Sequence, residues 1–129
     1  VIVPYGISGP TAQIVVSYGT LSSPPVTVAV APTNPGIYTI SASGAGQGAI
    51  LNYNAATNDY SINGQSSPAA RGSTVVLYMT GAGAMSSAIS NQLIPASPAV
   101  TPSAGLTVTL GGQAATVAGA QAPPGSVPG

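Results

Sequence analysis

Residues 106–118 read LTVTLGGQAATVA, and this stretch decides the fold class. Apolar and hydroxyl-bearing residues surround the pair Gly111-Gly112. Because glycine adopts positive φ angles at little cost, two glycines between such segments are typical of a two-residue primed β-turn. The stretch therefore predicts a β-hairpin with strands at Leu106–Leu110 and Gln113–Ala118.

The rest of the chain repeats this pattern of short strands and turns. Runs rich in Val, Ile, Thr and Tyr fit a pleated, half-buried surface, and glycine- and proline-rich turns separate them. The predicted strands are Val1–Tyr5, Ala12–Tyr18, Val26–Ala31, Ile37–Ser41, Ala49–Tyr53, Tyr60–Ile62, Ser73–Thr80, Leu106–Leu110 and Ala114–Ala118. The predicted helical segment is Ser86–Leu93, which is short and weak. Many short strands predict an all-β fold with little or no helix, namely one or more immunoglobulin-like β-sandwiches of short antiparallel strands.

The chain of 129 residues has the length of a single domain. We expect a β-sandwich module over residues 1–118, with a division into two subdomains at 1–32 and 33–118 as the alternative. Residues 119–129 are rich in proline and glycine and predict a tail without a strand. Pro4 cannot donate a ladder hydrogen bond, which makes the first predicted strand either an edge strand or a strand whose pairing begins or ends at Pro4.

Charge is almost absent from this sequence. Asp59 and Arg71 are the only formally charged side chains, and the chain has no Lys, Glu, His, Cys, Trp or Phe. Soluble domains are usually about 25% charged, whereas this chain is 2% charged and 44% hydrophobic. A net charge of zero removes the long-range repulsion that keeps identical proteins apart, so the composition favours association.

The same composition excludes several partners. Binding to nucleic acid or to an anionic membrane surface needs a cluster of cations, and one arginine cannot provide it. No apolar run approaches the roughly 20 residues that span a bilayer, so we expect no membrane insertion. The start at Val1 without Met is consistent with a processed, exported segment, and we expect a secreted, extracellular or cell-surface protein.

The residue types also argue against catalysis and cofactor binding. Nucleophilic catalysis needs a general base beside the nucleophile, and the chain has no His, Lys or Glu. Asp59 alone cannot form the carboxylate pair of a glycosidase. The glycine-rich run Ser43–Gly48 lacks the helix and cation of a phosphate site, so it predicts a turn or bulge. We expect no enzyme activity and no cofactor.

A group of four polar residues raises the question of calcium. Asn52, Asn54, Asn58 and Asp59 offer several hard oxygens, but calcium usually takes six to eight oxygens with more than one carboxylate. The alternative is a turn in which these side chains bind their own backbone.

For Asp59 and Arg71 we expect a structural role, either as an ion pair or with Arg71 anchoring a loop through carbonyl groups. The alternative is an arginine that binds a ligand.

Tyrosine is the only aromatic residue type. The six tyrosines are Tyr5, Tyr18, Tyr38, Tyr53, Tyr60 and Tyr78. Rings with polar tips suit the edge of a β core, and they also suit a platform on which a carbohydrate stacks. Both interpretations stay open at this point.

Several motifs resemble those of a family of uncharacterised C-terminal domains on secreted proteins of Acidobacteria, the Solibacter-type C-terminal domains. The main one is SPAARGSTVVLYMTG at residues 67–81, with support from NPGIYT at 34–39, GQGAILN at 46–52 and TVTLGGQAA at 107–115. The opening is also similar to immunoglobulin-like IPT/TIG modules, in YGTLSS at 18–23 and PVTV at 25–28. The resemblance implies an immunoglobulin-like fold outside the cell, without known catalysis.

Two classes of function fit these observations. The first is a structural subunit of an extracellular filament or surface assembly, in which identical chains join head to tail. Compared with the resembled family, the closing strand is missing after the Pro/Gly-rich tail, and the N-terminal strand of the next copy would replace it by strand complementation. The donor residues would be Val1, Ile2, Val3, Pro4 and Tyr5. The alternatives are that Val1–Tyr5 folds back into its own domain, or that the sequence is part of a longer chain with tandem modules. The second class is a secreted adhesion or carbohydrate-binding module, and a spacer between other domains is a third. Serine and threonine also offer sites for O-linked glycans.

Overall fold

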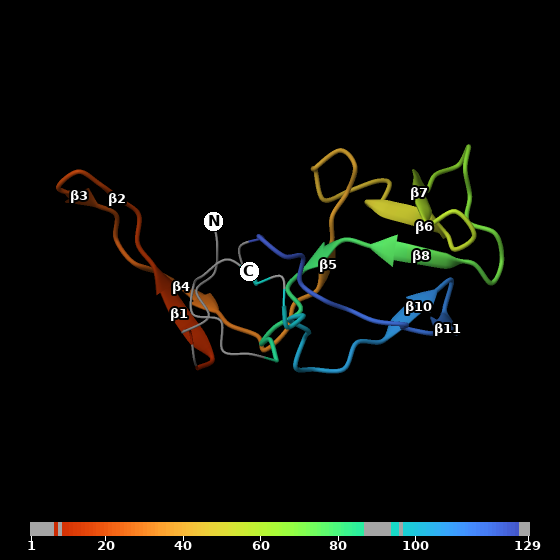
Figure 1. Cartoon of the computed structure of the whole chain (residues 1–129). Helices are drawn as coiled ribbons and strands as arrows, with labels where there is room; N and C mark the ends of the chain where they lie inside the picture. The colour runs from red at the N-terminus through yellow and green to blue at the C-terminus, as the bar shows by residue number, and fades with distance from the viewer. Residues whose placement is uncertain (1–6, 8, 87–93, 96, 127–129) are drawn as a thin grey trace. The chain divides into compact units, whose positions relative to one another are not determined.

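The computed structural model describes residues 7, 9–86, 94–95 and 97–126 (Figure 1). It contains eleven short strands and no helix within these residues, so the predicted all-β architecture is confirmed. The sheets are small and antiparallel, consistent with the immunoglobulin-like β-sandwich class. The strands are β1 (Thr11–Ile14), β2 (Ser17–Tyr18), β3 (Leu21–Ser22), β4 (Val26–Ala29), β5 (Gly36–Ile37), β6 (Ile50–Asn54), β7 (Asp59–Ile62), β8 (Thr74–Leu77), β9 (Met79–Thr80), β10 (Val108–Leu110) and β11 (Gln113–Ala115).

Two sequence predictions fall outside the described residues. The predicted strand Val1–Tyr5 lies there entirely, and so does most of the predicted helix Ser86–Leu93. No helix in the described part of the chain has the length and apolarity needed to cross a membrane.

The chain forms two compact units. One consists of the described residues of Val1–Asn34 and Ala82–Gly129, and the other of Pro35–Gly81. The unit Pro35–Gly81 is built on the three-stranded sheet β7-β6-β8, in which β6 is central. A second ladder of this unit pairs β5 with β9. The domain boundaries predicted at residues 32 and 118 stay predictions.

In the other unit, Thr11–Ala29 forms one long hairpin, which we call the arm (Figure 1). β1 pairs with β4 at its base, and β2 pairs with β3 at its tip. At the tip, Gly19 has a φ of 60° and starts the two-residue turn Gly19-Thr20, as a type II′ turn requires.

The arm changes register between its two ladders. The predicted strand Ala12–Tyr18 is interrupted, because Val15 and Val16 belong to neither ladder. Ile14 pairs with Val26, whereas the Val16 oxygen accepts from the Ser23 nitrogen at 2.9 Å. Two prolines therefore lie opposite Val15, and proline has no N–H with which to continue the ladder.

The hairpin predicted from residues 106–118 is confirmed in its centre. β10 and β11 pair antiparallel, and Leu110 is the direct partner of Gln113. Gly111 and Gly112 have φ angles of 57° and 81°, which are the two positive values of a type I′ turn. The strands are shorter than predicted, because the ladder ends at the pair formed by Val108 and Ala115.

The core of this unit is small. Ile94 and Val100 are the only buried hydrophobic side chains among the described residues, and Met85 and Ala122 pack against them. Backbone hydrogen bonds hold the segments together, including Ala122 N to Val100 O at 2.8 Å. Most domains bury far more, so the large apolar side chains that the structure describes stay mostly in contact with solvent.

Candidate functional site

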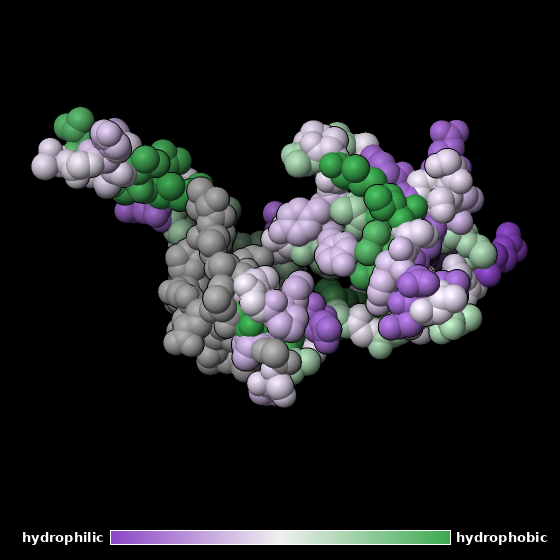
Figure 2. Space-filling view, turned by 45° about the horizontal axis from the view of Figure 1, so that its top comes forward, coloured by the Kyte–Doolittle hydropathy of each residue, from purple (hydrophilic) through white to green (hydrophobic). Residues whose placement is uncertain are grey.

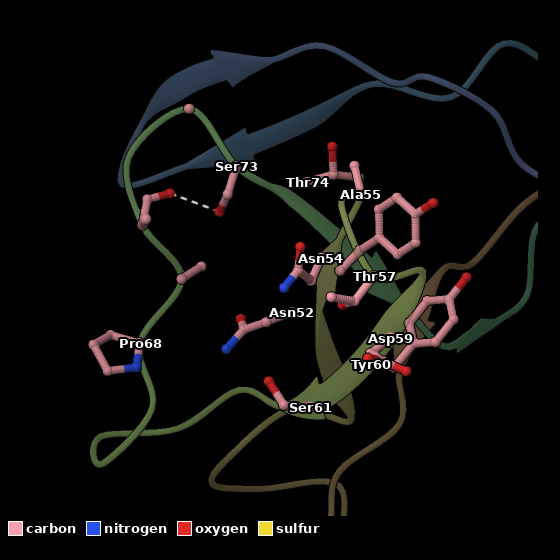
Figure 3. A pocket seen from close by; sticks show the side chains of 14 residues that line it. Asn52, Asn54, Ala55, Thr57, Asp59, Tyr60, Ser61, Pro68, Ser73 and Thr74 are labelled. Atoms are coloured by element: carbon pink, nitrogen blue, oxygen red, sulfur yellow. Dashed lines mark hydrogen bonds between the residues drawn. The ribbon is translucent and has the colours of Figure 1, made fainter.

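Polar side chains gather on one face of the ladder formed by β6 and β7. Neighbouring residues of a strand point to opposite sides of a sheet, so the register places Asn52, Asn54, Asp59 and Ser61 on the same face. Figure 3 shows the side chains of Asn52, Asn54 and Ser61 directed toward the loop that carries Pro68 and Ser73. An open hollow of about 660 Å³ lies between this face and residues 68–74.

Hydrogen bonds tie the sheet to the loop region. Asn52 is central, because its Nδ2 donates to the Ser67 carbonyl at 2.9 Å and its Oδ1 accepts from Asn63 Nδ2 at 2.8 Å. The loop is closed further along by Ser73, whose Oγ donates to the Ala70 carbonyl at 2.7 Å (Figure 3). Both polar atoms of the Asn52 side chain therefore have a partner within the chain.

The other members of the calcium candidate group also bond within the chain. Asn54 Oδ1 accepts from the backbone N–H of Ala56 at 3.0 Å, and Asn58 Oδ1 accepts from the Tyr53 hydroxyl at 3.1 Å. Asn58 has a φ of 56° and sits in the β6–β7 turn, a conformation that asparagine tolerates better than most residues. The Asn54 bond is that of the turn interpretation, whereas the Asn58 bond joins two side chains and does not reach the backbone. Of the four candidate ligands, Asp59 brings the only carboxylate.

The opposite face of the β6–β7 ladder is aromatic and apolar. Tyr53 and Tyr60 are direct cross-strand partners, with ring centroids 5.2 Å apart and a tilt of 37° between the ring planes. Leu51 and Ile62 form the next pair on this face. Tyr60 is 56% exposed and Ile62 is also exposed. The face therefore offers an accessible ring beside aliphatic surface, as a stacking platform requires.

Asp59 and Arg71 occupy separate places in this unit. Asp59 begins β7 opposite Asn54, while Arg71 lies in the turn before β8, and both side chains are exposed. No ion pair joins them within the described residues. The anchor role of Arg71 stays a prediction.

The arm carries a concentration of exposed apolar side chains (Figure 2). At its tip, Tyr18 and Leu21 are direct partners and are 88% and 73% exposed. At its base, Ile14 and Val26 are partners and are both at least half exposed. Sequence reasoning did not single out this surface, although the signal was present, since Thr11–Val16 contains neither charge nor proline.

The predicted donor residues Val1, Ile2, Val3, Pro4 and Tyr5 lie outside the described residues. Their role in assembly therefore stays a prediction.

Comparisons of the chain with known protein families, with curated proteins and with solved structures found no match. The resemblance to the Solibacter-type domains stays a prediction carried by the motifs quoted above.

Proposed function

We propose that this protein is a non-enzymatic structural subunit of an extracellular filament or surface assembly, with copies joined head to tail by β-strand complementation. The observation that carries the proposal is the distribution of apolar surface. Two apolar side chains are buried among the described residues, whereas fifteen large ones, including Tyr18, Leu21 and Ile62, are exposed. Removing apolar surface from water contributes about 25 cal/mol per Å², so such a chain has much to gain from association.

Unpaired strand edges support the same proposal. The arm consists of two-stranded ladders, and no third strand pairs with them among the described residues. An isolated two-stranded hairpin is marginally stable in water, and its edges accept further strands readily. The neutral surface adds no electrostatic repulsion between copies, since each chain has one positive and one negative side chain.

The experiment is negative-stain electron microscopy of the purified full chain and of a variant without residues 1–5. We expect filaments or ordered arrays from the full chain and soluble, non-polymerising protein from the variant. Filaments of unchanged length and abundance without residues 1–5 would refute the strand-complementation step. Isolated particles from both proteins would refute the structural function.

A carbohydrate-binding function is the second candidate, and the accessible Tyr60 ring favours it. Sugars bind by stacking on such rings while amide and hydroxyl groups bond their edges. Titration of oligosaccharides into the protein, followed by calorimetry, tests this candidate. Tyr60→Ala should abolish the heat signal, whereas Tyr38→Ala, which removes a ring of 55% exposure in the same unit, should not. The absence of binding across neutral and acidic oligosaccharides would eliminate this function.

A further inference from the structure

Among the described residues, the arm has a strand edge without a partner, and the position of this edge follows from its hydrogen bonds. Val30 N donates to Pro10 O at 2.8 Å, which makes Pro10 and Val30 a hydrogen-bonded pair at the base of the β1–β4 ladder. Hydrogen-bonded and non-hydrogen-bonded pairs alternate along an antiparallel ladder. The pair formed by Gln13 and Thr27 is therefore non-hydrogen-bonded. The N–H and C=O of Gln13 point away from β4, and those of Thr27 point away from β1.

The two edges of the arm differ in their ability to accept another strand. Beside Thr27, the edge of β4 is interrupted by Pro24 and Pro25, which have no N–H. β1 ends at Ile14, and the segment from Thr11 to Val16 contains no proline, glycine or charge. Six-residue segments of high β-propensity and no charge pair readily with copies of themselves, and natural edges usually carry a charge or proline that prevents this.

We propose that the free edge of β1 pairs antiparallel with β1 of a second copy of this chain. The pairing is centred on Gln13, which lies opposite Gln13 of the second copy. The two strands then exchange both outward backbone hydrogen bonds at this position. This lateral contact is distinct from the head-to-tail joint of the proposed function, and it uses residues that the structure describes.

The side chains support a homotypic partner. Ala12, Ile14, Val26 and Val28 share the apolar face of the β1–β4 ladder, while Gln13 lies on the polar face. In the proposed register, Ala12 of each copy lies beside Ile14 of the other, so the apolar faces become continuous. The Gln13 amide is both donor and acceptor, and two identical amides can therefore bond each other.

Charge and symmetry also fit a contact between two copies. No charged residue occurs before Asp59, so two identical arms approach without like-charge repulsion. Pairing of identical strands about a two-fold axis is isologous and closes as a dimer.

Cysteine cross-linking in the full chain tests this proposal, because the natural sequence has no cysteine. Gln13→Cys places one thiol at the centre of the proposed contact, where paired Cα atoms about 5.5 Å apart permit a disulfide. Thr27→Cys is the matched control, since Thr27 is the direct partner of Gln13 and is equally exposed, but belongs to the other edge. We expect disulfide-linked dimers to form at least tenfold faster for Gln13→Cys than for Thr27→Cys. Equal rates for the two variants would overturn the proposal.

Proline substitutions give a second readout that does not depend on thiols. Gln13→Pro and Thr27→Pro each remove one outward N–H and no hydrogen bond of the β1–β4 ladder. Sedimentation equilibrium should show dimerisation weakened at least tenfold by Gln13→Pro and unchanged by Thr27→Pro; equal weakening by both would contradict the proposal. The two proposals fail separately. If the full chain forms no filaments but Gln13→Cys still cross-links, the proposed function alone is refuted. If filaments form but Gln13→Cys does not cross-link, this inference alone is refuted.

Discussion

Gly83 occupies a position where a side chain would meet two obstacles. Its φ of 82° lies in the left-handed region, which costs a residue with a Cβ about 1–2 kcal/mol. An added Cβ would also collide with the Pro32 carbonyl oxygen and would lie 2.8 Å from Thr33 Cγ2. Overpacking of this kind costs roughly 1–3 kcal/mol. Gly83→Ala should therefore lower the free energy of unfolding by about 2–5 kcal/mol.

Gly125→Ala is the matched control, because Gly125 has a φ of 75° in the same unit and open space around its Cα. It should lose only the backbone part, about 1–2 kcal/mol. Thermal unfolding followed by circular dichroism should then give a melting temperature roughly 4–12 °C lower for Gly83→Ala than for the control. Equal melting temperatures would refute the close approach of Gly83 to Pro32.

Three further predictions concern the unit Pro35–Gly81 and the charged residues. Asn52→Ala removes the hydrogen bonds to Ser67 and Asn63, so urea unfolding should show a free energy of unfolding lower by about 1–3 kcal/mol. An unchanged midpoint would contradict the role of Asn52 as the link between sheet and loop. Arg71→Ala tests the predicted anchor in the same assay, and we expect it to lower the free energy of unfolding by about 1–3 kcal/mol. A change within about 0.5 kcal/mol, which is usual at exposed positions, would contradict the anchor role. The free energy of unfolding should vary by less than about 1 kcal/mol from pH 7 to pH 3, because the sequence has one carboxyl side chain. Cooperative acid unfolding in this range, measured by circular dichroism, would contradict this prediction.

Local turn chemistry explains which elements were predictable from the sequence. The turn at Gly111-Gly112 was found because two adjacent glycines permit the two positive φ angles that a type I′ turn needs. The alternative of a backbone-binding turn holds for Asn54, whose Oδ1 accepts from the Ala56 N–H, whereas Asn58 Oδ1 accepts from the Tyr53 hydroxyl.

Non-local features could not be predicted in the same way. The predicted strand Ala12–Tyr18 is divided because prolines on the opposite side of the hairpin interrupt its partner, and no property of the strand itself shows this. The pairing of β5 with β9 joins segments more than forty residues apart. The polar hollow likewise depends on a loop from residues 68–74 passing beside β6, which strand periodicity does not encode.

The central claim is that the exposed apolar surface of this neutral chain is a surface for self-association. Sedimentation velocity over concentrations from about 1 to 100 μM, at low and high salt, tests it most directly, because charge-free contacts lose nothing to ionic screening. The account predicts species that grow heavier with concentration and are as abundant at high salt as at low salt. A single species of 12.3 kDa at every concentration and in both salts would contradict it.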